Sequence, residues 1–182
     1  MADAGSYAAT MLKDVPGGDS LKISSLLTNG EVTNGLQPGS SVYVAPGIFD
    51  GMGAYDNHDG TYSLLVNHEL GNTNGYQYQV QVIAGTAAPT TQTVSGARIS
   101  RLVVAKDLDS DSANGFQSRV LAGGLAYSQV ISPNAGFSLG SGLSRFCSAN
   151  LIEANTFAPG RGAADRLFLV GEESGEIGRA HV

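Results

Sequence analysis

Glutamates close two short apolar runs of this sequence, where a strand would end and a side chain could reach a ligand. Glu69 ends the first run, and Glu172 with Glu173 follows the run 167–170. Carboxylates are hard oxygen donors that suit calcium and ferric ions. Neighbouring strand residues point to opposite faces, so at most one of Glu172 and Glu173 faces a given site. The competing interpretation is that all three are solvated strand-end charges.

Cys147, the single cysteine, has the side chain with the most distinctive chemistry. A lone cysteine permits no internal disulfide, whereas its thiolate is a soft donor that binds iron well. A buried, small apolar side chain is the alternative and the usual state of a free cysteine. Asp50 and Asn67 are candidate supporting residues of the same site, although duties in a turn and at a strand end explain them equally well.

Two further motifs have competing explanations. Asp107-x-Asp109-x-Asp111 resembles the opening of a calcium loop, but serines stand where the loop needs its glycine and its closing glutamate, so a solvated turn is favoured. The segment 136–140 has the Gly-x-Ser-x-Gly pattern of an esterase elbow, which needs a strand before it and a helix after it. The residues that follow do not resemble a helix start. We therefore disfavour serine hydrolysis, and we interpret His58 as a turn residue.

Composition favours an all-β fold and excludes some partners. The chain has 182 residues, 25 of them glycine, and its apolar stretches are short and separated by turn residues. A net charge of -6 without a basic cluster argues against binding nucleic acid. No apolar run approaches the roughly 20 residues of a membrane-spanning helix, so no membrane partner is expected.

The predicted strands are short and joined by turns. Residues 1–47 are expected to be a loop-rich entry segment, and residues 48–176 the main domain. The segments 51–56 and 61–66 flank an Asp-Gly turn and predict a hairpin. The segment 97–105 breaks strict alternation, which predicts a strand buried on both faces. Further strands are expected near 116–121, 126–131 and 166–170, and another element of unspecified type is expected to begin at 145–152. A polar stretch is expected at 71–93 and a loop at 132–144. This pattern fits a sandwich, a barrel or propeller blades.

The last six residues, Ile177 to Val182, match a translation of ATC GGA AGA GCA CAC GTC, the start of a widely used sequencing adapter. We interpret them as an artefact and give His181 no functional role. The codon of Glu176 would share bases with the adapter. The natural protein is therefore expected to continue beyond Gly175.

Three segments, in this order, resemble the PhoX family of secreted alkaline phosphatases. They are Asp50-Gly-Met-Gly-Ala-Tyr-Asp56, then Leu65-Val-Asn-His-Glu-Leu70, and last Arg145-Phe-Cys-Ser148 followed by Leu169-Val-Gly-Glu-Glu173. The resemblance runs from about Pro46 to Gly175. Better-known members follow the cysteine with a segment containing Thr-Pro-Trp-Gly, whereas this chain continues with Ser-Ala-Asn-Leu-Ile and has no tryptophan.

The resemblance implies a six-bladed β-propeller whose central channel holds iron and calcium and hydrolyses phosphate monoesters. With about 40 to 50 residues in a blade, this chain would supply an incomplete set of blades and be inactive by itself. The implied metal ligands are Glu69, Cys147, Glu172 and Glu173. A secreted or periplasmic location is implied too, with the signal upstream of Met1. The rival function is a secreted calcium-binding or adhesive propeller without turnover.

Overall fold

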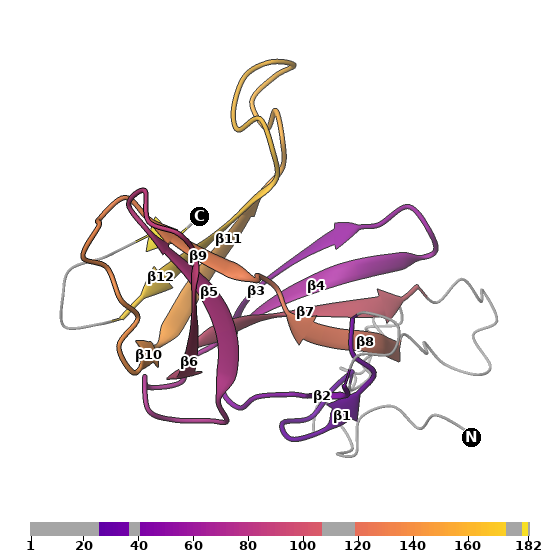
Figure 1. Ribbon diagram of the computed structural model, residues 1–182. Helices are drawn as coiled ribbons and strands as arrows, with labels where there is room; N and C mark the ends of the chain where they lie inside the picture. Colours follow the sequence, from indigo (N-terminus) through magenta and orange to yellow (C-terminus); the bar gives the residue numbers. More distant parts are fainter. Residues whose placement is uncertain (1–25, 37–40, 107–118, 174–179, 182) are drawn as a thin grey trace. The chain divides into compact units, whose positions relative to one another are not determined.

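The computed structural model describes residues 26–36, 41–106, 119–173 and 180–181, and within them the fold is all-β, as predicted (Figure 1). In this part of the chain no helix is long and apolar enough to cross a membrane. The strands are β1 (Val32–Thr33), β2 (Tyr43–Val44), β3 (Phe49–Asp56), β4 (Thr61–His68), β5 (Tyr78–Ala84), β6 (Thr90–Gly96), β7 (Arg98–Ala105), β8 (Arg119–Leu125), β9 (Gln129–Ser132), β10 (Gly142–Leu143), β11 (Phe146–Ile152), β12 (Leu167–Glu172) and β13 (Ala180–His181).

The strands form four small sheets. Their orders are β1-β2, β10-β6-β5-β9, β11-β12-β13 and β3-β4-β7-β8. Two pairings in the second sheet, β10 with β6 and β5 with β9, are parallel, which differs from the antiparallel architecture of propeller blades. Among the described residues no propeller is found, so the predicted fold class is confirmed only as all-β.

The chain divides into two compact units. The first comprises 1–45, 55–64 and 102–124, and the second comprises 46–54, 65–101 and 125–182. Every candidate ligand, Asp50, Glu69, Cys147, Glu172 and Glu173, belongs to the second unit.

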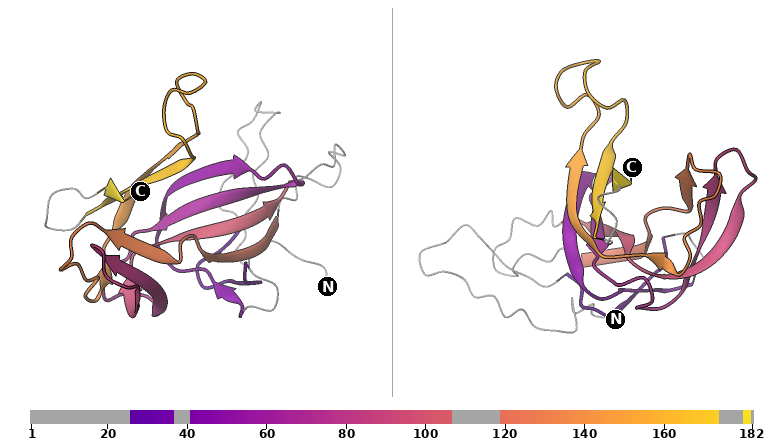
Figure 2. Two further views of the ribbon diagram at one scale, coloured as in Figure 1. Left: turned by 45° about the horizontal axis from the view of Figure 1, so that its top comes forward. Right: turned by 90° about the vertical axis from the view of Figure 1, so that its left-hand side faces the viewer.

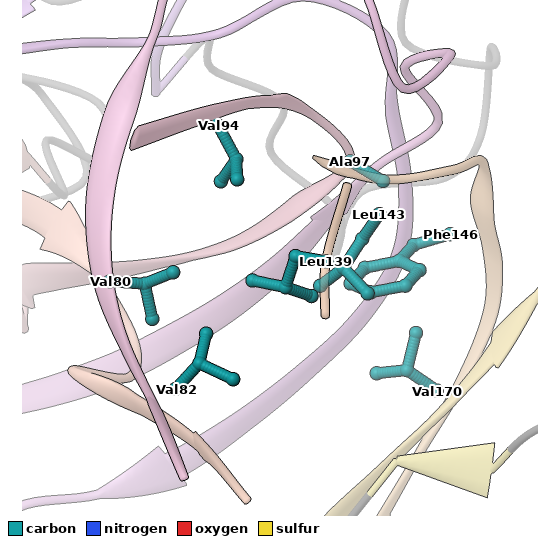
Figure 3. Close-up of a cluster of buried hydrophobic side chains, with 8 residues drawn as sticks. All are labelled: Val80, Val82, Val94, Ala97, Leu139, Leu143, Phe146 and Val170. Atoms are coloured by element: carbon teal, nitrogen blue, oxygen red, sulfur yellow. The ribbon is translucent and has the colours of Figure 1, made fainter. Parts of the chain in front are cut away.

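A cluster of buried apolar side chains forms the core of the second unit (Figure 3). It comprises Val80, Val82, Val94, Ala97, Leu139, Leu143, Phe146 and Val170. Phe146 is 1% exposed and precedes Cys147 in β11, so core packing fixes the strand that carries the thiol. Burying such an aromatic side chain contributes about 1.5–3 kcal/mol through the hydrophobic effect.

The predicted hairpin is confirmed by β3 and β4. The Asn57 N–H donates to the Thr61 carbonyl oxygen at 3.2 Å, and the Asp59 carboxylate accepts from the Thr61 N–H at 3.0 Å. Gly60 has a φ of 86°, which a residue with a Cβ adopts only with strain. The Asp-Gly pair of the sequence therefore closes the turn as expected.

Two predictions about the middle of the chain need correction. β7 alternates strictly between buried and half-buried residues, so it is not buried equally on both faces. Its buried face includes Arg98 and Ser100, whose polarity hides the alternation from a search for apolar residues. The stretch 71–93 holds β5 and most of β6, which we did not predict. The alternation of Val80 and Val82 with glutamines marks β5, but the polar residues around it obscured the pattern.

The remaining predicted elements are confirmed in part. The entry segment contains only β1 and β2 in its described part, and the loop 132–144 includes the short β10. β9, β11 and β12 lie at or near their predicted positions. β11 and β12 pair antiparallel, and the segment joining them extends past their ends in each view (Figure 2). Of the six C-terminal residues, Ala180 and His181 form β13 beside β12, and the others lie outside the described residues.

Candidate metal site

Asp50, Glu69 and Cys147 come together in the second unit. Asp50 is the second residue of β3, Glu69 follows β4 directly, and Cys147 is the second residue of β11. One ligand atom from each lies within 4.8 Å of the other two. Such spacing lets three side chains bind one ion, because metal–ligand bonds of about 2.0–2.3 Å place ligand atoms within roughly 4.6 Å of each other.

Backbone hydrogen bonds hold the three segments together. The Glu69 N–H donates to the Ile48 carbonyl oxygen at 3.0 Å, which ties the end of β4 to the start of β3. The Arg145 N–H donates to the Leu70 carbonyl oxygen at 2.8 Å, which ties the same segment to the start of β11. The candidate ligands therefore sit on main chain that is fixed from both sides.

Backbone strain marks the same place. Ile48 has a φ of 53° and Arg145 a φ of 42°, and each stands two residues before a candidate ligand. The left-handed region is unfavourable for residues with a Cβ, above all for β-branched isoleucine, and costs about 1–2 kcal/mol. Strain of this kind persists only where the surroundings enforce it, and it clusters at functional sites.

Cys147 lies half-buried among negative charges. Its Sγ is 3.6 Å from the Arg145 carbonyl oxygen. Burial, together with the carboxylates of Glu69 and Glu173, raises the pKa of the Cys147 thiol to about 12. The thiol therefore keeps its proton at neutral pH unless a cation offsets these charges.

Glu172 and Glu173 separate, as the alternation of a strand predicts. Glu173 is exposed and close enough to Cys147 to raise the pKa of the thiol. Glu172 instead accepts a hydrogen bond through Oε1 from the Ser144 N–H at 2.8 Å. The group of three with ligand spacing includes Asp50, predicted only as a supporting residue, and contains neither Glu172 nor Glu173, which were predicted as ligands.

Asn67, the other predicted supporting residue, is fully buried beside this group. Its Nδ2 donates to the Ser148 carbonyl oxygen at 3.0 Å, next to Cys147 in the chain. Its Oδ1 is buried without a hydrogen-bond partner among the described residues. An unpaired buried acceptor of this kind costs about 1–3 kcal/mol.

His68 is a buried structural residue next to Glu69, not an exposed base. Its side chain is fully buried, with Nδ1 at 2.9 Å from the Gly47 carbonyl oxygen and Nε2 at 2.5 Å from Ser100 Oγ. A carbonyl oxygen only accepts, so Nδ1 carries the proton and Nε2 accepts from the serine hydroxyl. Burial, with a smaller contribution from the charge of Arg98, lowers the pKa of His68 to about 4.

Arg98 is a buried charge that the sequence analysis missed. Its guanidinium lies over the rings of Tyr76 and Tyr78, at 4.4 and 4.3 Å from their centroids, and donates from Nη2 to the Tyr76 carbonyl oxygen at 2.7 Å. A cation between aromatic faces is stabilised by their quadrupoles. The sequence signal for this burial was the position of Arg98, two residues before Ser100 and therefore on the same face of β7.

The competing motifs gain no support from the structure. Ser138 is exposed and lies in an irregular segment, and β10, not a helix, follows the 136–140 segment. His58 is exposed at the hairpin turn, with a φ of 60°, as predicted. The 107–111 acidic motif lies outside the described residues.

Comparisons with known proteins add no family assignment. Protein-family models, curated proteins and solved structures all give no match to this chain. The candidate metal site therefore rests on the side chains and their geometry.

Proposed function

We propose that Asp50, Glu69 and Cys147 bind a transition-metal cation, and that the site serves the hydrolysis of phosphate monoesters, as the PhoX resemblance implies. The observation that carries the proposal is the convergence of these three ligand-type side chains, from three distant segments, within 4.8 Å. Strain at Ile48 and Arg145 supports it, because both residues flank the ligands.

The donor set fits iron and does not fit calcium. One thiolate with two carboxylates suits a borderline transition metal such as iron, whereas calcium takes six to eight oxygen ligands. Within the described part of the chain, this is the only group of three or more histidine, cysteine or acidic side chains with metal-ligand spacing. The resemblance implied both metals, and the donor chemistry of these residues supports iron rather than calcium.

The residues around the site explain why a cation would be needed for phosphate chemistry. Asp50, Glu69 and Glu173 are acidic and repel a phosphate ester, and the Cys147 thiol keeps its proton among them. A bound iron ion would supply the positive charge that neutralises phosphate oxygens during transfer. The unpaired Oδ1 of Asn67 offers one more buried acceptor beside the group.

The wider expectations stay predictions. The six-bladed propeller, the secreted or periplasmic location and the inactivity of the chain by itself depend on the resemblance alone. The rival function, a calcium-binding or adhesive protein, is not favoured by a site that contains a thiol.

Phosphatase activity tests the catalytic part of this proposal. We expect the full-length protein, loaded with iron, to hydrolyse para-nitrophenyl phosphate. Cys147→Ala should lower kcat/KM at least 100-fold through loss of iron, which metal analysis of the same samples measures. Ser148→Ala is the matched control, since only its backbone carbonyl serves Asn67. Iron binding without turnover would refute the proposed phosphatase activity but still support the metal site.

A further inference from the structure

Gly51 stands where β3 passes β11 at a distance that leaves no room for a side chain. A Cβ on Gly51 would lie 2.6 Å from the Ala149 backbone nitrogen, 2.7 Å from the Ala149 Cβ and 2.9 Å from the Ser148 carbonyl carbon. Ordinary contacts of a Cβ are 3.4–4 Å. Two of the three atoms belong to the backbone of β11, so they cannot rotate away.

The same approach continues two residues further along both strands. A Cβ on Gly53 would lie 2.9 Å from the Leu151 Cβ and 3.0 Å from the Phe168 ring. Gly51 opposes Ala149 and Gly53 opposes Leu151, so the two strands run alongside each other in the same direction. Asp50, one residue before Gly51, therefore lies next to the start of β11, where Cys147 is located.

We infer that Gly51 is a positioning residue of the metal site, and that its missing side chain lets Asp50 lie against Cys147. An alanine at this position would push the strands apart by about 1 Å to restore normal contact distances. Ligand distances in metal sites lie within about 0.2 Å of their standard values. A displacement of this size would therefore remove Asp50 from the ligand set.

Gly53 provides a matched comparison on the same face of β3. Its three nearest neighbours are side-chain atoms, two of them in the ring of Phe168, and it is three residues from Asp50. We expect Gly53→Ala to disturb packing and lower stability while moving Asp50 less than Gly51→Ala does, because its contacts are less short and it is farther from Asp50 along β3. The difference between the two variants separates positioning of the ligand from general damage to the interface of β3 with β11.

A disulfide trap tests the inference without any metal. Asp50→Cys should form a bridge with Cys147, the single native cysteine, under mild oxidation of the full chain, detected by loss of free thiols and by mass. Adding Gly53→Ala should leave the rate of bridge formation within about threefold of the rate in Asp50→Cys alone. Adding Gly51→Ala should slow bridge formation at least tenfold. Equal rates in the two double variants, or no bridge in Asp50→Cys itself, would overturn the inference.

A metal titration tests whether Gly51 also affects metal binding, a consequence that rests on the proposed function. With cobalt(II) as the probe, Gly51→Ala should weaken binding at least tenfold and Gly53→Ala less than threefold, at matched cooperativity of urea unfolding. Equal weakening would make Gly51 a merely structural residue. A native chain that binds no cobalt would refute the proposed function, while the disulfide rates would still decide whether Gly51 positions Asp50.

Discussion

The thiol of Cys147 and its acidic neighbours form an arrangement that a cation would stabilise. Burial and the carboxylates of Glu69 and Glu173 hold the proton on the sulfur, with a pKa of about 12. Structural cysteines usually lie in apolar surroundings, whereas this one faces carboxylates from two other segments. The combination favours a ligand role over the small apolar side chain that the sequence left as the alternative.

His68 should make stability depend on pH. Its pKa falls from 6.5 to about 4 on folding, so between these values the unfolded chain binds a proton that the folded chain excludes. Stability is therefore full above pH 6.5 and is lost as the pH falls toward 4. The loss from this residue at pH 5 should be about 2 kcal/mol.

Urea unfolding at pH 7 and pH 5 measures this effect. His68→Asn, which keeps a donor for the Gly47 carbonyl oxygen, serves as the comparison. The native chain should lose about 2 kcal/mol more than the variant between the two pH values. Equal losses would show that His68 is not excluded from protonation in the folded state.

At the scale of elements, local signals in the sequence predicted more than long-range ones. The hairpin of β3 and β4 was predicted because its turn residues and alternation are local. The parallel pairings of β5 with β9 and of β6 with β10 were not, because no residue pattern specifies which distant strands meet.

The same limit applies to the site. Glu69 and Cys147 stood out by type and resemblance, but the inclusion of Asp50 depends on the close passage of β3 along β11. Glu172 and Glu173 lie outside the group, and Glu172 accepts a hydrogen bond from the Ser144 N–H instead. Neither the passage of β3 along β11 nor the hydrogen bond of Glu172 can be predicted from the sequence.

β11 offers a direct test of the core. Phe146→Ala should lower the free energy of unfolding by about 3–5 kcal/mol, because the side chain is 1% exposed within the apolar cluster. Phe157→Ala, in the segment joining β11 to β12, should change it by less than about 0.5 kcal/mol, since Phe157 is 83% exposed. Chemical denaturation measures both, and similar effects of the two substitutions would contradict this description of the core.

For the whole molecule, charge decides which ligands can approach. A net charge of -6 attracts cations and repels phosphate esters, so a phosphatase built on this chain needs a bound cation first. Among the described residues, one group of ligand-type side chains, where three segments of the second unit meet, could hold it. Metal binding is therefore the central claim, and catalysis depends on it.

The most direct test is a titration of the reduced full chain with cobalt(II), followed by ultraviolet absorption and by proton release. We predict a thiolate-to-cobalt charge-transfer band that saturates at one equivalent of cobalt. Binding should release the Cys147 proton. Excess calcium should not remove the band. Ser148→Ala should keep the band and Cys147→Ala should abolish it. A native chain without the band, or a band that survives in Cys147→Ala, would contradict the metal site.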